Sequence, residues 1–463
     1  MPRGKPYALG CPAIALSIAA VLVLLLVYGM RSDYDELNPF IGELLPAGHC
    51  LCHTSANFEC STCLDTLENP AKPQCENGMA RDWEYRYGRD DTNEGLTTMQ
   101  CNAAFPGLFE DINRAVNLRR DNPIQTSELS SMKMYQGMVR AMIYNGELYV
   151  IEVNCMGDDH RKKVVAALSS IFRSMTAIPN RRDLPNIEFI FTIEDMADEP
   201  DHPLWALTRR AYDQQVWLMP DFGFWSWNVE GIGPYTQVVS EIEEQDVDSH
   251  WDDKQKKLVW RGKPSFSPKL RRALLDVAQG KTWADVRALR WADTESMRND
   301  FISSVDQCQY MFIAHIEGRS YSASLKYRQA CRSVVIAHKL QWIQHHHYLM
   351  VSNGTQQNFV EVERDFSDLD DTMAFLLGNP EEAKRIADNN VKTFRERYLT
   401  PAAEGCYWRE LIRGWGEVSF RPELYEYVEG KSRARGIRVE SFILLSSEEQ
   451  MHFRADASHL LAR

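Results

Sequence analysis

Two short loops combine cations with glycine in a way that suits the binding of phosphates. The first spans residues 261–263 (Arg-Gly-Lys), after the strand-like residues 258–260 and ahead of a helix that begins near Lys269. The second runs from Gly318 to Lys326 and also follows an apolar stretch. Loops that leave a strand and open into a helix present backbone N–H groups and cations to phosphate oxygens. Two ordinary surface loops are the alternative, since the chain has neither a GxxxxGK[ST] nor a GxGxxG motif.

Asp195 is the candidate general base. It follows the apolar stretch Ile187–Ile193, which predicts a buried strand. A carboxylate at the carboxyl end of such a strand lies where α/β proteins bind their ligands. In a single-displacement transfer to a hydroxyl, one such base removes the hydroxyl proton. A helix cap or an ion-paired loop acid is the alternative, and the rival acids nearby are Glu194, Asp198 and Glu199.

Three other groups could bind ligands by residue type. Residues 345–347 are three consecutive histidines, which cannot all face one ion in regular structure, so we expect surface or loop histidines there. Residues 368–371 (Asp-Leu-Asp-Asp) have a metal-binding spacing but lie at an expected helix start, where acids are favourable in any case. The aromatic residues 217–227 suit sugar faces, although at least half should belong to a core. The sequence predicts no metal site.

The elements that must position these residues alternate as in an α/β protein. A hairpin is expected over residues 141–153, with its turn at Asn145 and Gly146. Residues 161–175 have apolar positions at helical spacing and precede the strand at 187–193. Around the second basic loop, strand, loop, helix, strand and helix follow one another, which predicts a Rossmann-like lobe.

Length and charge restrict the class of protein. The chain has 463 residues, which allows two or three domains of about 100–200 residues or one large bilobed enzyme. Its formal net charge of −13 repels phosphate backbones, so we expect no nucleic-acid partner. Anionic ligands then require local basic pockets.

The N-terminus predicts a membrane anchor. Residues 11–30 carry no charge, and about 20 apolar residues span a bilayer as a helix. Because Arg3 and Lys5 precede this stretch, the positive-inside rule places residues 1–10 in the cytosol and the rest in the lumen. A cleaved signal peptide is the alternative, but it would be shorter and end in a small-x-small site. We therefore expect a single-pass type II protein of the Golgi or endoplasmic reticulum membrane.

The cysteines agree with a lumenal domain. Apart from Cys11 at the membrane edge, their number is even, which suits disulfides in an oxidising compartment. Cys60 and Cys63 have the spacing of half a zinc knuckle, but no second pair completes it, so disulfides are favoured. Asn353 begins an N-glycosylation sequon, which is usable only in the lumen. The remaining lumenal cysteines are Cys50, Cys52, Cys75, Cys101, Cys155, Cys308, Cys331 and Cys406.

Several motifs in order resemble glycosyltransferase family 90, over roughly residues 108–420. They are LPNIEFIFTIED, LMPDFGFW, WRGKPSFSPKLRRALL, EGRSYSASLKYRQACRSVVIAH and GCYWREL. The family includes fungal capsule-associated transferases and animal protein O-glucosyltransferases, and this chain resembles the fungal branch more closely. The resemblance implies a GT-B fold with two Rossmann-like lobes facing a cleft. It also implies inverting transfer from UDP-glucose or UDP-xylose with no required metal or other cofactor.

The resemblance also implies roles for individual residues. Asp195 matches the family's catalytic base, and Cys308 and Cys331 match a family disulfide. Cys406 should pair back to the N-terminal cysteines. Arg272 is an alternative to Arg271, because a gap of about two residues separates the aligned motifs. The residues implied to bind the UDP-sugar are Arg261, Gly262, Lys263, Arg271, Gly318, Arg319, Ser320, Tyr321, Ser322, Ser324 and Lys326.

Two residues depart from the family's pattern. Ser324 stands where the animal enzymes carry an Arg that closes the second loop, and Arg319 or Lys326 could supply that charge instead. Lys263 replaces a small polar residue. These departures affect the contacts with the diphosphate and the choice of sugar rather than the fold.

The expected organisation is that of an anchored two-lobed enzyme. Its parts are a cytosolic tail at 1–10, an anchor at 11–30, a cysteine-rich stem at 31–105, an N-terminal acceptor lobe at 106–245, a C-terminal donor lobe at 250–400 and a returning segment at 401–463, ending in a helix and tail from 432. The predicted function is the transfer of glucose or xylose to a hydroxyl of a glycan or glycoprotein. A catalytically inactive glycan-binding or scaffold protein on the same fold is the first alternative. A glycoside hydrolase is the second, and it would need two carboxylates that flank the bond.

Overall fold

The computed structural model describes residues 83–155, 157–227, 233–247, 250–290, 292–445 and 452–454. The expected tail, anchor and most of the expected stem lie outside these residues. Within them, no helix is both long and apolar enough to cross a bilayer. The compact unit that begins at Asp82 holds two large β-sheets, each with its own helices, and one separate two-stranded sheet, which confirms the α/β class. Each sheet with its helices is called a lobe below.

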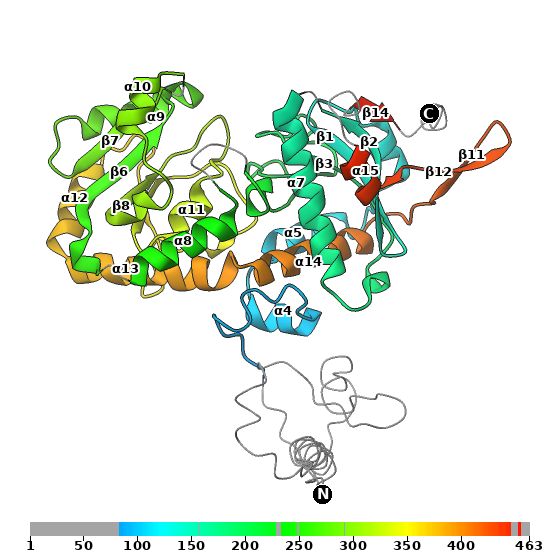
Figure 1. Ribbon diagram of the computed structural model, residues 1–463, viewed down its shortest axis with the longest axis horizontal. Coiled ribbons are helices and arrows are strands. Elements are labelled where there is room, and N and C mark those ends of the chain that lie inside the picture. Colours follow the sequence, from blue (N-terminus) through cyan, green and yellow to red (C-terminus); the bar gives the residue numbers. More distant parts are fainter. Residues whose placement is uncertain are drawn as a thin grey trace, which may run out of the picture. The chain divides into compact units, whose positions relative to one another are not determined.

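The first sheet has seven strands of mixed direction, shown at the right of Figure 1. Its centre is the expected hairpin, in which Asn145 and Gly146 both have positive φ angles of 51° and 76°. This lobe is therefore not the parallel Rossmann-like sheet that the sequence analysis expected, because β1 runs antiparallel to both of its neighbours. The strands are β1 (Met138–Tyr144), β2 (Glu147–Asn154), β3 (Ile187–Thr192), β4 (Leu204–Ala206), β5 (Val216–Leu218), β13 (Ile437–Arg438) and β14 (His452–Arg454).

The second sheet has five strands, and all of its pairs are parallel. Their order is β10-β9-β8-β6-β7, so the chain reverses its direction of winding between β6 and β8. In open α/β sheets, ligands bind beyond the carboxyl ends of the two strands at this switch point. The strands are β6 (Gln255–Gly262), β7 (Ala284–Ala288), β8 (Tyr310–His315), β9 (Val334–His338) and β10 (Val360–Val362).

Helices cover both faces of the second sheet. Alternate residues along a strand face opposite sides, and Trp260 and Phe312 accordingly pack with α9, α12 and α13, whereas Val259 and Ile313 pack with α8 and α11. The α-helices within the described residues are α4 (Thr98–Ala104), α5 (Glu110–Arg119), α6 (Thr126–Ser131), α7 (Gly157–Thr176), α8 (Tyr235–Val247), α9 (Pro268–Ala278), α10 (Thr294–Asp300), α11 (Leu325–Ala330), α12 (Leu369–Gly378), α13 (Pro380–Thr393), α14 (Pro401–Glu417) and α15 (Val439–Leu445).

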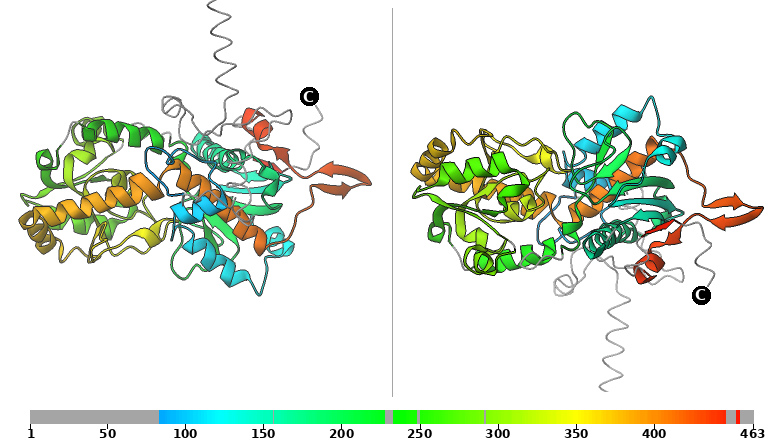
Figure 2. Two further views of the ribbon diagram at one scale, coloured as in Figure 1. Left: turned by 90° about the horizontal axis from the view of Figure 1, so that it is seen from below. Right: turned by 90° about the horizontal axis from the view of Figure 1, so that it is seen from above.

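The chain returns to the first lobe through α14. Figures 1 and 2 show α13 on the second lobe and α14, the next helix, against the first. Trp415 of α14 packs on Trp205 and donates its indole N–H to the carbonyl of Glu188, 3.0 Å away. Beyond α14, a hairpin of β11 (Tyr425–Val428) and β12 (Lys431–Ala434) precedes two short strands that pair with β2. The sequence analysis expected only a helix and a tail there.

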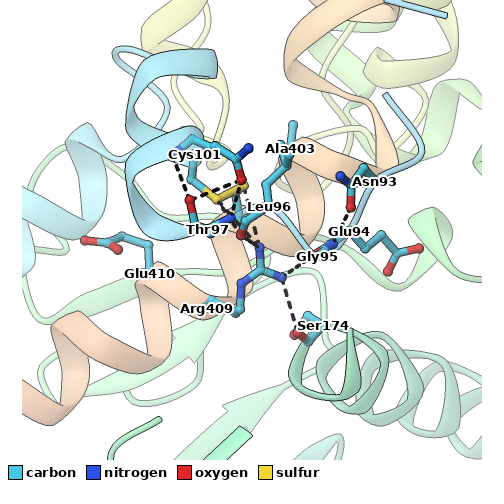
Figure 3. Close-up of a disulfide and its surroundings, with 12 residues drawn as sticks. Asn93, Glu94, Gly95, Leu96, Thr97, Cys101, Ser174, Ala403, Arg409 and Glu410 are labelled. Carbon is cyan, nitrogen blue, oxygen red and sulfur yellow. Dashed lines mark hydrogen bonds between the residues drawn. A yellow bond between two sulfur atoms is a disulfide. The ribbon is translucent and has the colours of Figure 1, made fainter. Parts of the chain in front are cut away.

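A disulfide joins the start of the folded unit to α14. Cys101 bonds to Cys406 across 305 residues of chain, and Cys308 bonds to Cys331 in the second lobe. Beside the first bond, the buried Arg409 donates to the carbonyls of Glu94 and Leu96, which fixes the turn that leads into α4 (Figure 3). Leu96, Cys101, Ala104 and Phe105 belong to the core of the first lobe, although the sequence analysis placed them in the stem.

The three consecutive histidines lie where the two lobes meet. His345 and His346 are in a turn, as the loop alternative predicted, but they are buried, so the surface alternative is wrong. The ring of His345 packs 4.9 Å from that of Tyr407 in the first lobe. His346 Nε2 lies 3.1 Å from Oε1 of Gln329. Burial lowers the pKa of His345 to about 3, so both rings are packed as neutral aromatic groups. Among the described residues, no cluster of three His, Cys, Asp or Glu side chains is arranged to hold a metal.

We predict that His345 makes the protein less stable as the pH falls. The unfolded chain takes up a proton at His345 near pH 6.5, whereas the folded chain does so only near pH 3, so stability is lost as the pH drops between these values. From about pH 7.5 to about pH 5.5 this loss is about 1.4 kcal/mol per imidazole. Urea unfolding of the wild type and of His345→Phe at both pH values checks it. Equal pH dependence in the two proteins would show that His345 does not titrate in this way.

Candidate active site

The two basic loops meet at the switch point of the second sheet. Because β6 and β8 are parallel neighbours, with Val259 opposite Ile313, their carboxyl ends lie side by side. The first loop leaves β6 at Gly262, and the second begins after β8 at Ile316. The loops that the sequence analysis selected therefore stand together at the edge where such sheets bind ligands.

Arg271 joins the two loops. Its Nε donates to the carbonyl of Glu317, 3.0 Å away, and its Nη1 donates to the carbonyl of Lys263 at 2.8 Å. The guanidinium is buried and lies 5.7 Å from the ring of Trp260. Burial lowers the pKa of Arg271 to about 10, and no carboxylate contributes to that shift. Arg272, the alternative, is exposed on the same helix.

Both loop glycines are required by close packing around Arg271. A Cβ on Gly262 would lie 2.5 Å from the ring of Trp260, which occupies the same face of β6 two residues earlier. A Cβ on Gly318 would lie 3.3 Å from Nη2 of Arg271. Gly318 is therefore packed closely against the guanidinium of Arg271.

Two of the expected donor-binding cations are engaged elsewhere. Arg261 lies on the opposite face of β6 from Trp260, and its Nη2 forms an ion pair at 2.9 Å with Asp285 of β7. Lys326 is buried in α11, where its Nζ lies 2.8 Å from Asp221 Oδ1. The charged groups of Arg261 and Lys326 are therefore paired with carboxylates elsewhere, whereas that of Arg271 joins the two loops.

The exposed residues of the loops are placed differently. Lys263 is exposed, with its Nζ 5.0 Å from the centre of the Phe266 ring, and Arg319 is exposed at the tip of the second loop. Ser322 and Ser324 are half-buried, and their hydroxyl groups are hydrogen-bonded to each other at 2.8 Å. Lys263 in the first loop and Arg319, Ser322 and Ser324 in the second form no ion pairs among the described residues.

The second loop also touches the candidate base. The buried Ser320 donates its hydroxyl to the backbone carbonyl of Asp195, which follows β3 of the first lobe. Tyr321 is packed in the core of the first lobe, and burial, with Asp221 and Asp195 nearby, raises the pKa of its phenol well above the ordinary range. The second loop and the end of β3 are therefore held together, although 125 residues separate Ser320 from Asp195.

Asp195 is exposed, as is Asp198, whereas two of the neighbouring acids are partnered. Glu194 Oε1 lies 2.8 Å from His160 Nε2, and Glu199 Oε2 lies 3.1 Å from His202 Nδ1. In the described part of the chain, no hydrogen bond or ion pair is found at the carboxylate of Asp195, so its oxygens are not occupied by other side chains.

Glu317 positions the second loop and was missed by the sequence analysis. Its buried carboxylate accepts from the backbone N–H groups of Gln341 and Trp342, at 2.7 and 2.8 Å, and pairs with Arg364 at 2.9 Å. It thereby links Gly318 to the segment that reaches the first lobe. An acid before a glycine gives no sign of this role, because such residues usually lie in solvated loops.

The aromatic residues 217–227 belong mainly to cores. Trp217, Phe222 and Phe224 are buried, whereas Trp225 and Trp227 are only partly buried. The ring of Trp225 lies 4.7 Å from the guanidinium carbon of Arg173.

Comparison with known proteins assigns the chain to a protein family. Residues 97–443 match the family model described as Glycosyl transferase family 90, which confirms the resemblance noted from the motifs. No curated protein matches the chain.

We predict that Asp221 and Lys326 act as a structural pair. Asp221→Asn leaves the buried Lys326 without its counter-charge and should lower the free energy of unfolding by about 3–5 kcal/mol. The double variant Asp221→Asn/Lys326→Met removes both charges and should regain most of that loss. Chemical unfolding of the three proteins measures these differences. A double variant as unstable as the single one would contradict the pairing.

Proposed function

The chain belongs to glycosyltransferase family 90, and on that premise we propose that it transfers glucose or xylose from a UDP-sugar to a hydroxyl of a glycan or glycoprotein, with inversion. The family establishes a glycosyltransferase, which uses a sugar donor and a glycan acceptor. The donor sugar, the base and the acceptor are the parts that we add. The two lobes, one wound as a parallel doubly wound sheet, suit the proposed GT-B arrangement.

The observation that carries the proposal is the contact between Ser320 and Asp195. It brings the loop at the switch point of the second sheet into contact with Asp195 of the first lobe, whose carboxylate is exposed. A donor held at the loops and an acceptor held at the first lobe would then meet at Asp195. Such positioning of two reactants can account for a large part of a rate enhancement.

The proposed reaction is a single displacement. The Asp195 carboxylate accepts the proton of the acceptor hydroxyl while that oxygen forms a bond to the anomeric carbon of the sugar. The bond between the anomeric carbon and the diphosphate oxygen breaks, and UDP leaves with the electron pair. Arg271 and the backbone N–H groups near Gly318 stabilise the charge that develops on UDP. Because a buried cation faces the leaving group, the proposal includes no metal ion.

We further propose a lumenal location, with residues 11–30 as a membrane anchor in the Golgi or endoplasmic reticulum. Two disulfides within the folded unit suit an oxidising compartment. Asn353 is exposed in the loop before β10, where a glycan would meet no obstacle from the core.

We predict that Asp195→Asn abolishes transfer without weakening UDP binding. Loss of a general base typically costs about 10²- to 10⁴-fold in rate, whereas the carboxylate is not part of the UDP site. UDP release from UDP-glucose and UDP-xylose, with water or a glycan acceptor, measures the rate. Calorimetry measures UDP binding.

The matched control is Asp198→Asn, a nearby acid on the same segment, which should retain activity. Full activity of Asp195→Asn would remove Asp195 from its proposed role. If the wild type neither binds nor cleaves either donor, the inactive glycan-binding alternative replaces the proposal.

A further inference from the structure

Arg328 is a buried cation for which the fold provides no anionic partner. It lies on α11, is 7% exposed, and its Nη1 lies 2.8 Å from Nδ1 of His315. Its Nε is buried and has no hydrogen-bond partner among the described residues. Burial holds the pKa of His315 well below its usual range, so the imidazole is neutral and accepts the hydrogen bond. It does not neutralise the charge of Arg328.

The other buried arginines show how unusual this environment is. Arg119, Arg209 and Arg261 each pair with a carboxylate. Arg409 and Arg271 instead donate to backbone carbonyls. In the described part of the chain, Arg328 has neither kind of partner, and an uncompensated buried charge costs several kcal/mol.

A second positive charge stands close to the first. Burial and, to a smaller extent, the charge of the nearby Arg271 together lower the pKa of Arg328 to about 9. His315 ends β8, one of the two strands at the switch point, so both guanidinium groups lie around the edge that carries the two loops. Two buried like charges repel each other unless a ligand with negative charge lies between or beside them.

The geometry of α11 directs Arg328 toward the second loop. A side chain in a helix points back toward the N-terminus and covers the preceding turn. Here the N–H of Arg328 donates to the carbonyl of Ser324, and both residues line one small cavity together with Tyr327 and with Ser304 and Gln307 of the segment before β8. Arg328 therefore brings a positive charge to the place where Ser324, one turn earlier, brings only a hydroxyl.

We propose that Arg328 is a second cation that binds the diphosphate of the donor, with its Nε edge donating to phosphate oxygens. This inference rests on the proposed function, since it names a further residue of the same donor site. A guanidinium suits this role because it donates two parallel hydrogen bonds to a phosphate group. Arg328 would take the phosphate-binding role that the sequence suggested for Arg261 and Lys326, whose charges are already paired within the protein.

The test compares UDP, uridine and inorganic diphosphate as ligands in calorimetry. Arg328→Leu should weaken the binding of UDP and of inorganic diphosphate by about 10- to 100-fold, as expected for lost hydrogen bonds to a charged group, and leave uridine binding unchanged. The melting temperature of the ligand-free variant should stay equal or rise, because an unpaired buried charge has been removed. Arg332→Leu, which removes a cation at the surface of the same segment, is the matched control and should bind UDP as the wild type does.

The double variant Ser324→Arg/Arg328→Leu moves the charge back by one helical turn and should restore most of the lost affinity for UDP. If Arg328→Leu binds UDP with wild-type affinity and melts at a lower temperature, Arg328 only supports His315 and the proposal is wrong. If Arg328→Leu does not fold, Arg328→Lys and the double variant provide the test. The proposal then requires that Arg328→Lys binds UDP more weakly than the wild type and that the double variant recovers affinity for UDP. A wild type that binds inorganic diphosphate through Arg328 but not UDP would overturn the proposed function and leave the anion site intact.

Discussion

The candidate site depends on one buried guanidinium that has no acid to neutralise it. Arg271 spans the ends of β6 and β8 by donating to a carbonyl in each loop. Trp260 beneath it and Gly318 beside it are fitted to its shape. Because carbonyls orient the cation without cancelling its charge, a positive potential persists at the switch point of a parallel sheet. The fold supplies that edge, and the side chain makes it suitable for an anion.

The junction between the lobes is built from buried polar and aromatic contacts as well as apolar ones. Arg209 of the first lobe pairs with Asp111 at 2.6 Å and forms an isolated β-bridge with Ile343 of the second. Glu317 ties the donor loop to the segment that carries this bridge. A shift of one lobe relative to the other would therefore act directly on the second loop, where we propose that the donor binds.

Much of the fold could be predicted from the sequence, because its strands are apolar and its turns carry diagnostic residues such as Asn145-Gly146. Asp195 and Arg271 could be selected as candidates, since each lies at the end of a clear element, and their roles stay predictions. Arg261 and Lys326 were misassigned because sequence shows that a cation lies in a loop but not which face of a strand it occupies. Asp285 reaches Arg261 only through the pairing of β6 with β7. The unpaired state of Arg328 likewise depends on residues that are distant in the chain.

The bond between Cys101 and Cys406 imposes an order on synthesis. Its loop of 305 residues contains most of the first sheet and all of the second, so the second lobe is an insertion within a covalent ring. The first lobe cannot be completed until α14 has left the ribosome. This helix emerges long after the residues of the first lobe that it must cover. The second lobe, whose strands are all contiguous within 255–362, can fold before then. A protease cut anywhere inside this ring would leave the two fragments joined, so nicked molecules would separate only after reduction.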